Sequence, residues 1–208
     1  MIELYTWTTP NGRKVSVALE EMGLDYTVKP INIGNDEQFS PEFLAISPNN
    51  KIPAIVDTDN GVSVFESGAI LAYLAEKSGK FLPAHGTAER AKVLEWLYWQ
   101  VGGFGPMLGQ LNHFARYRED RIPEAIERFT VESARLYKVL DTRLGEAEFV
   151  AGDYSIADMS VYPWSAVALQ GVEQLAGASF PNVARWHDAV AARPAVQKGM
   201  NIPPSSDG

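Results

Sequence analysis

The chain has 208 residues, of which 46% are hydrophobic and 21% are charged, as is typical of a globular protein with a substantial core. Its formal net charge is −8 and neither half is rich in lysine and arginine, so we expect no nucleic-acid partner. The sequence has no cysteine, which excludes a disulfide, a thiolate metal site and a cysteine nucleophile.

The sequence also argues against a membrane protein and against a metal site. No apolar run approaches the length of about 18 residues that a spanning helix needs, and the first residues lack a signal peptide's basic and apolar regions. We therefore expect a soluble, cytoplasmic protein with no membrane partner. His85, His113 and His187 show no ligand spacing, so we expect no metal. If the protein performs thiol chemistry, a ligand must bring the thiol.

The first 82 residues predict an α/β domain. Apolar residues recur with strand and helix periods in the order βαβ and then ββα, which is the order of a thioredoxin-like domain with a parallel first pair. The expected elements are a strand at 2–6, a helix at 13–23, a strand at 26–33, a short helix at 41–46, hairpin strands at 52–56 and 62–65, and a helix at 67–77.

The pattern after a linker at 83–86 is helical throughout. We therefore divide the chain into a thioredoxin-like domain, residues 1–82, and an all-α domain, residues 87–208. Helices are expected at 88–102, 123–144 and 181–193. The Gly/Pro cluster at 102–106 should kink or break the first of them. Ser155 and Asp158 have the spacing of a capping box, to which we assign a folding role.

Glu66 and Ser67 lie where the hairpin meets the following helix. The first N–H groups of a helix have no internal partner, so a carboxylate is favoured there, and Glu66 could pair with an ammonium group. The two residues together suit both ends of an amino acid, although a simple helix cap is the alternative. A cis bond before Pro53 would leave the N–H and C=O of Ile52 open to an extended peptide.

Three motifs carry a resemblance to a known family. Asn50-Lys51-Ile52-Pro53-Ala54, with Phe65-Glu66-Ser67-Gly68-Ala69-Ile70, resembles the glutathione site of the cytosolic glutathione transferase superfamily. The stretches Thr8–Gly12 and Trp99–Met107 resemble the bacterial nu class, whose members are glutathione-dependent disulfide reductases, and its yeast prion-regulator relative. The resemblance covers roughly residues 1 to 200. It implies a homodimer that uses reduced or oxidised glutathione as co-substrate.

The resemblance also implies how glutathione is held. Glu66 and Ser67 would bind its γ-glutamyl end, and the Ile52 backbone, set by Pro53, would pair with its cysteinyl unit. Lys51 would lie near the glycyl carboxylate, although such a lysine is by default a solvated loop charge. Further implied contacts are Gln38 at the glycyl end, Arg128 reaching a second glutathione across the dimer, and an electrophile pocket of Phe104, Met107, Phe114 and Tyr117. The default interpretation is a surface charge for Arg128 and core packing for the aromatic residues.

Thr9 and Asn11 are the candidates for stabilising the glutathione thiolate. Hydrogen bonds to the charged form and a helix N-terminus both lower the pKa of a thiol. Most transferases place Tyr, Ser or Cys at this point, and this chain departs from that pattern. The nu-class resemblance implies Thr9 and Asn11 instead. Turn and N-cap chemistry is the alternative interpretation for both.

The expected activity is that of a glutathione-dependent disulfide-bond oxidoreductase. Weak activation of the thiolate suits attack on a disulfide better than attack on poor aromatic electrophiles. With no protein cysteine, the mixed disulfide must form on glutathione, and a second glutathione must resolve it. Two alternatives stay open: a glutathione transferase that conjugates small electrophiles, and a catalytically silent, transferase-like binding module.

Overall fold

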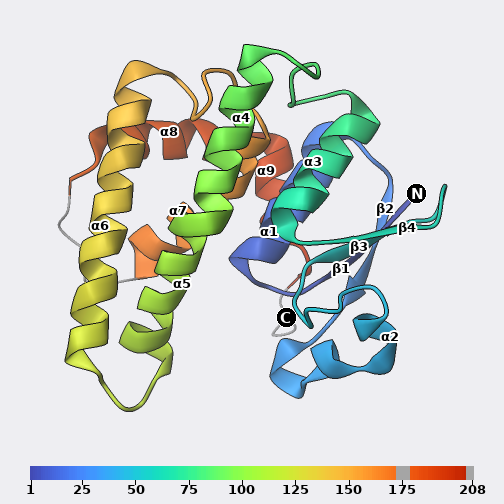
Figure 1. Cartoon of the computed structure of the whole chain (residues 1–208), viewed down its shortest axis with the longest axis horizontal. Helices are drawn as coiled ribbons and strands as arrows, with labels where there is room; N and C mark the ends of the chain where they lie inside the picture. Colours follow the sequence, from blue (N-terminus) through green and yellow to red (C-terminus); the bar gives the residue numbers. More distant parts are fainter. Residues whose placement is uncertain (172–178, 205–208) are drawn as a thin grey trace. The chain divides into compact units, whose positions relative to one another are not determined.

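The structure is a computed structural model, which describes residues 1–171 and 179–204 (Figure 1). It divides the chain into two compact units: unit 1 comprises Met1–Leu82 and the segment that begins at Ala192, and unit 2 comprises Pro83–Ala191. The sequence-based division into residues 1–82 and 87–208 places that last segment with the helices, and these domain boundaries stay a prediction. None of the described helices combines the length and apolar character that crossing a bilayer requires.

Unit 1 is built on a four-stranded mixed sheet with the strand order β2-β1-β3-β4. The pair of β1 (Ile2–Thr6) and β2 (Tyr26–Pro30) is parallel, and β3 (Ala54–Asp57) pairs antiparallel with both β1 and β4 (Val62–Phe65). Alternate residues of β1 are buried, which fixes the register of the central strand against the core. The helices α1 (Pro10–Met22) and α3 (Ser67–Ser78) pack against each other. The predicted thioredoxin-like order is confirmed.

Several boundaries in unit 1 differ from the prediction, and three of them have a clear local reason. Helix α1 begins at Pro10, because proline is suited to the first helical position, where its missing N–H costs nothing. Strand β2 ends at Pro30, and the Asn32 side chain then accepts a hydrogen bond from the Gly34 N–H (2.9 Å) and starts a 3₁₀ turn. Strand β3 begins at Ala54, because Pro53 has no N–H for the ladder. The short elements between β2 and β3 are η1 (Ile33–Asn35), η2 (Glu37–Phe39) and α2 (Pro41–Leu44).

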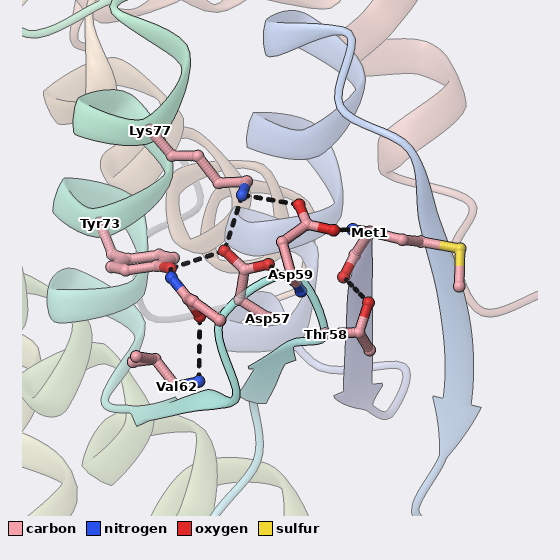
Figure 2. A network of polar contacts seen from close by, with 8 residues as sticks. Met1, Asp57, Thr58, Asp59, Val62, Tyr73 and Lys77 are labelled. Carbon is pink, nitrogen blue, oxygen red and sulfur yellow. Dashed lines mark hydrogen bonds and ion pairs between the residues drawn. The ribbon is translucent and has the colours of Figure 1, made fainter.

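The turn between β3 and β4 is attached to α3 through Asp57, whose side chain is fully buried. Figure 2 shows Tyr73 and Lys77 of α3 reaching its carboxylate, at 2.6 and 2.8 Å. Burial alone would raise the pKa of Asp57, but the hydrogen bonds with Lys77 and Tyr73 and the N–H of Asp59 lower it to about 2. The terminal ammonium of Met1 pairs with Asp59 at 2.6 Å, so the same network also holds the start of the chain.

The late helix α9 (Pro194–Gly199) completes unit 1 by packing on α1. The Ser16 hydroxyl donates to the Gly199 carbonyl at 2.7 Å, and Arg193 pairs with Glu21 at 2.6 Å. A Cβ at Gly199 would lie 2.5 Å from the Val17 Cα, so only glycine permits this approach of the two helices.

Unit 2 is helical in the part of it that the structure describes. Its first helix, α4 (Ala88–Trp99), continues into α5 (Gly105–Asn112) through π-helical winding at Gln100–Phe104, and Figure 1 shows one ribbon without a gap. Of the predicted kink or break at the Gly/Pro cluster, the break is therefore wrong, and the irregularity takes the form of π-helical winding. A Cβ at Gly105 would lie 2.6 Å from Gln100 Nε2, so the glycine serves close packing. The remaining elements are η4 (His113–Tyr117), α6 (Pro123–Glu146), α7 (Ile156–Gly171) and α8 (Pro181–Ala191).

The predicted capping box at the start of α7 is confirmed. The Ser155 hydroxyl accepts from the Ala157 N–H at 3.3 Å, and the Asp158 carboxylate accepts from the Ser155 N–H at 3.0 Å. Asp158 also accepts from Trp186 Nε1 of α8 at 2.8 Å. Burial raises the pKa of Asp158 to about 6, although the N–H donors of Val150, Trp186 and Ser155 oppose it. The box thus joins α7 to α8, which supports its folding role.

Candidate functional site

A cavity of about 160 Å³ lies in unit 1, where three segments distant in sequence meet. The first turn of α1, the loop before β3 and the junction of β4 with α3 each contribute to its wall. The lining residues are Asn11, Lys51, Ile52, Pro53, Phe65, Glu66 and Ser67. The structure therefore brings six of the predicted site residues together, and it adds Phe65.

The start of α3 forms one wall of the cavity. Ser67 is the first residue of the helix and is 7% exposed, whereas Glu66 before it is exposed. The Glu66 side chain makes no capping hydrogen bond to α3, which contradicts the simple-cap alternative for this residue. The first-turn N–H groups and the positive end of the helix dipole therefore adjoin the cavity and suit a carboxylate.

The backbone of Glu66 has φ 73° and ψ 116°, a region that a residue with a Cβ rarely adopts. Such a conformation costs of order 1–3 kcal/mol and persists only where the surrounding structure imposes it. Here β4 ends immediately before Glu66 and α3 begins immediately after it. The sharp change of direction between the two elements therefore falls on one residue of the cavity wall.

The loop at Lys51–Pro53 forms the second wall. The Ile52–Pro53 peptide bond is cis, as the sequence analysis expected. The Ser47 hydroxyl donates to the Lys51 carbonyl at 2.8 Å and so holds the loop. Within residues 1–171 and 179–204, the N–H and C=O of Ile52 make no hydrogen bond, and they remain available to an extended ligand.

The first turn of α1 forms the third wall through Asn11. Thr9 caps this helix, and its hydroxyl accepts from the Gly12 N–H at 3.2 Å, so the N-cap interpretation is realised for Thr9. A hydroxyl that accepts in this way can still donate its own hydrogen. Asn11 lies at the positive end of the helix dipole, where a thiolate is stabilised. Asn11 lines the cavity, and Thr9 is not among the lining residues.

Gln38 is not brought to the cavity wall. Its Nε2 donates to Asp36 Oδ1 at 3.4 Å within the loop between β2 and β3. Its Oε1 is buried and has no hydrogen-bond partner among the described residues. The loop therefore orients Gln38 locally, and its contact with glutathione stays a prediction.

Lys14 is the functional candidate that the sequence analysis missed. Its side chain is 2% exposed, and its Nζ donates to the Ser67 Oγ at 3.2 Å. Burial lowers the pKa of Lys14 to about 7, and the nearby charge of Glu66 opposes that shift. One signal was present: Lys14 lies one helical turn before Ala18, on the apolar face that the spacing of Val15, Ala18, Leu19 and Met22 had already identified.

A second cavity, of about 590 Å³, lies in unit 2. It contains two of the predicted site residues, Arg128 and Met107, among acidic and apolar neighbours. The lining residues are Met107, Glu124, Glu127, Arg128, Phe129, Val131 and Glu132. Arg128 thus lies on a hollowed and partly acidic surface of α6.

The three aromatic residues predicted for an electrophile pocket have different surroundings. Phe104 is fully buried and stacks on Trp99 at 5.0 Å, which is the core packing of the default interpretation. Phe114 stacks on Phe129 at 5.6 Å, and Tyr117 is 71% exposed. The cavity of about 590 Å³ described above is lined by none of the three, and their role in binding an electrophile stays a prediction. The described residues contain no group of three or more His, Asp or Glu side chains arranged to hold a metal.

Comparison with known proteins identifies the family. The glutathione S-transferase N-terminal domain matches residues 1–76, and the C-terminal domain matches residues 113–194. The disulfide-bond oxidoreductase YfcG of Escherichia coli is 51% identical over 207 residues, covering 96% of this chain and 94% of that protein.

Two solved structures are also similar along nearly the whole chain. A glutathione transferase from Burkholderia graminis, with two glutathione molecules bound per subunit, has a TM-score of 0.92 and 42% identity, covering 98% of this chain and 88% of that one. A glutathione transferase from Pseudomonas putida, with one glutathione disulfide bound per subunit, has a TM-score of 0.92 and 43% identity, covering 97% and 91%. The chain therefore belongs to the glutathione transferase family.

Proposed function

We propose that this chain is a glutathione-dependent disulfide-bond oxidoreductase. The observation that carries the proposal is the cavity in which the starts of α1 and α3 meet the open backbone of Ile52. It offers separate sites for a carboxylate, an ammonium, an extended peptide unit and a thiolate. The similarity to the Escherichia coli disulfide-bond oxidoreductase supports the reaction type, and the bound glutathione disulfide of the Pseudomonas putida structure supports the ligand.

Each part of glutathione matches a group in the cavity. The γ-glutamyl carboxylate accepts hydrogen bonds from the Ser67 hydroxyl and the first N–H groups of α3, and the γ-glutamyl ammonium pairs with Glu66. The cysteinyl unit pairs with the N–H and C=O of Ile52, and Lys51 lies towards the glycyl carboxylate. Gln38, from the loop outside the cavity wall, adds a further contact at the glycyl end. This arrangement holds the tripeptide extended, with its sulfur towards Asn11.

Thr9 and Asn11 stabilise the thiolate at the start of α1. Because the Thr9 hydroxyl accepts from the Gly12 N–H, its hydrogen can be donated to the sulfur. The amide of Asn11 and the helix dipole add to this stabilisation. The glutathione thiol is therefore ionised more readily in the cavity than in water.

The reaction is a pair of thiol–disulfide exchanges. The thiolate sulfur bonds to one sulfur of the substrate, the substrate S–S bond breaks, and the departing thiolate takes up a proton. A second glutathione thiolate then attacks the mixed disulfide, releasing the second substrate thiol and leaving glutathione disulfide. Two glutathione thiols are oxidised and one disulfide is reduced, so the balance needs no protein cysteine, and the chain has none.

The second glutathione, the dimer and the cytoplasmic location belong to the same proposal. A homodimer would let Arg128 of one subunit reach the second glutathione of its partner, with Phe104, Met107, Phe114 and Tyr117 near the substrate. The two glutathione molecules per subunit of the Burkholderia graminis structure support a two-glutathione reaction. Light scattering tests the dimer: a mass of twice 22.9 kDa is expected, and the monomer mass would contradict it.

Two assays run side by side test the reaction type. Glutathione-dependent reduction of hydroxyethyl disulfide should exceed conjugation of a halogenated nitrobenzene. A clear excess of conjugation would favour the electrophile-conjugating alternative. Retention on immobilised glutathione without turnover of any disulfide would favour the binding module.

Thr9→Ala tests the thiolate site within that reaction. It should lower disulfide reductase turnover by at least about tenfold, the size of one lost hydrogen bond to a charged group. Thr9→Ser keeps both the helix cap and the hydroxyl and should retain most of the turnover, which separates thiolate stabilisation from folding. Unchanged turnover in Thr9→Ala would remove Thr9 from the mechanism.

A further inference from the structure

The Ser67 hydroxyl is placed between the cavity and a buried ammonium group. Ser67 lines the cavity, and the Nζ of Lys14 lies 3.2 Å from its Oγ on the protein side. An ammonium group has only donors, so Ser67 must accept in this contact. The hydroxyl hydrogen of Ser67 is consequently directed elsewhere and can be donated to a ligand.

We propose that Lys14 is a positioning residue of this site, whose buried ammonium orients the Ser67 hydroxyl as a donor towards the carboxylate of the ligand. This inference rests on the glutathione site of the proposed function. The ammonium also places a positive charge behind the start of α3, where the helix dipole already favours an anion. The hydrogen bond from Ser67 is strengthened because a charged donor polarises the hydroxyl.

The fold fixes Lys14 in this position from both sides. Lys14 follows Asn11 by one turn of α1, so both residues face the same region of unit 1. Helix α3, which begins with Ser67, packs directly on α1. With 2% of its surface exposed, the Lys14 side chain cannot move its charge into water as a surface lysine does.

Burial and one nearby charge act on the ammonium of Lys14. Among the described residues, Glu66 is a charged side chain whose field favours the ammonium, against the larger effect of burial. Other acidic groups on the packed elements are paired elsewhere: Glu20 with Lys198 at 2.9 Å and Glu21 with Arg193 at 2.6 Å. The remaining charged residues on α1, α3, α9 and β1 are Glu3, Arg13, Glu76 and Lys77, and these elements carry no histidine.

The hydrogen bond between Lys14 and Ser67 can run in either direction, depending on the protonation state of Lys14. The ammonium donates to Ser67, whereas a neutral amine can accept from Ser67 and take its hydrogen away from the ligand. Because burial lowers the pKa of Lys14 to about 7, the free protein contains both states near neutral pH. A ligand carboxylate beside Ser67 favours the ammonium, so binding should take up a proton and should weaken as the pH rises above 7.

Calorimetry with S-methylglutathione tests this inference, because that ligand has no thiol whose ionisation would release a proton. Titrations in HEPES and in Tris at pH 7.5 should show uptake of about half a proton or more per ligand. Affinity should fall by about tenfold from pH 6 to pH 8. Binding with no proton uptake and no pH dependence would overturn the role of Lys14 and leave the glutathione site intact. An absence of binding at every pH would overturn both.

Variants connect the effect to the residue. Lys14→Met should bind S-methylglutathione about tenfold or more weakly at pH 6, without proton uptake. Lys80→Met is the matched control, because Lys80 of the same unit donates to the Met22 carbonyl at 2.8 Å and does not line the cavity. It should keep both the affinity and the proton uptake. Wild-type behaviour in Lys14→Met would overturn the inference.

A double variant shows whether Lys14 acts through Ser67. Ser67→Ala removes the hydroxyl and should weaken binding by itself. In the Ser67→Ala background, Lys14→Met should cost less affinity than it does in the wild-type chain, since the hydroxyl that Lys14 orients is absent. If the fold losses of affinity in the two single variants multiply in the double variant, the two residues act independently, and the positioning role of Lys14 would be overturned. The proton uptake of the wild-type protein tests the inference even if a variant fails to fold.

Discussion

The two ends of α3 adjoin two buried charges with very different surroundings. Towards its C-terminal end, the fully buried carboxylate of Asp57 receives Lys77 and Tyr73 within 2.8 Å (Figure 2). At its N-terminal end, the buried ammonium of Lys14 donates to the neutral Ser67 hydroxyl, and the charge of the exposed Glu66 opposes the effect of burial on it. The pKa of Asp57 is lowered to about 2, and that of Lys14 to about 7.

This difference shows what decides the role of a buried charge. Where an ion of opposite sign lies in contact, the charge is held over the whole physiological range and the group stabilises the fold. Where the effect of burial dominates, the pKa of a lysine moves towards neutral pH and its charge can respond to a ligand. One helix thus adjoins a structural charge at one end and a responsive charge at the other.

Removing Asp57 should have the largest effect on stability. Asp57→Ala should lower the free energy of unfolding by about 3 kcal/mol, because Lys77 and Tyr73 lose a buried partner. Urea denaturation measures this. Asp59→Ala is the control: its side chain is 59% exposed, so the loss should be much smaller than that of Asp57→Ala. Equal losses in the two variants would break the comparison.

The pH dependence of the Asp57 effect follows from the direction of its pKa shift. The folded-state pKa, about 2, is below the ordinary value of 3.8, so the stabilisation is fully present above pH 3.8 and is lost as the pH falls towards 2. The difference in stability between the wild-type chain and Asp57→Ala should shrink over that interval. A difference that stays constant from pH 5 to pH 2 would contradict it.

Lys14→Met should change the free energy of unfolding in the opposite direction to Asp57→Ala, and by a smaller amount. Replacing a buried charge whose pKa is lowered by burial with an apolar side chain of similar length should raise the free energy of unfolding by about 1–2 kcal/mol at pH 6. The folded-state pKa of about 7 is below the ordinary 10.5, so the wild-type chain should gain stability as the pH rises from 7 towards 10.5. The advantage of the variant should therefore decline over that range. Denaturation at pH 6 and pH 9 measures both, and a destabilised variant would show that Lys14 is a structural charge like Asp57.

Glu66→Gly should have the smallest effect on stability. It tests whether the backbone of Glu66, at the N-terminal end of α3, is strained. Glycine adopts φ 73° without steric cost, so the variant should be about 1 kcal/mol more stable than Glu66→Ala. Both variants lack the carboxylate and should bind S-methylglutathione about tenfold or more weakly by calorimetry. Equal stability of the two would show that the backbone at Glu66 carries no strain.

Most of the fold follows from local patterns in the sequence. The apolar period predicts β1 and α3, the Asp57–Gly61 stretch predicts the hairpin turn, and Ser155 with Asp158 predicts the start of α7. The errors lie where tertiary packing overrides a local signal. The Gly/Pro cluster near Gly105 predicts a kink or a break, but the helix continues with π-helical winding, and Gly105 packs closely on Gln100.

The parts of the candidate site that consist of short, contiguous motifs were predicted from the sequence. Lys51 to Pro53 and Glu66 with Ser67 are each contiguous, and the structure brings them together with Asn11. Lys14 was missed because its role comes from a contact with Ser67, 53 positions away, that no local pattern encodes. Gln38 is oriented by its own loop, so its distance from the ligand depends on loop geometry rather than on sequence spacing.

The contact of α9 with α1 has a consequence for synthesis. The Ser16 hydroxyl bonds to the carbonyl of Gly199, which lies 183 positions later in the chain and is therefore synthesised later. At a translation rate of 5–20 residues per second, the ribosome delivers that partner about 10 to 40 s after Ser16 itself. Throughout that interval the nascent chain exposes the face of α1 that α9 will cover, so we expect newly made protein to need protection by chaperones until the last helix emerges.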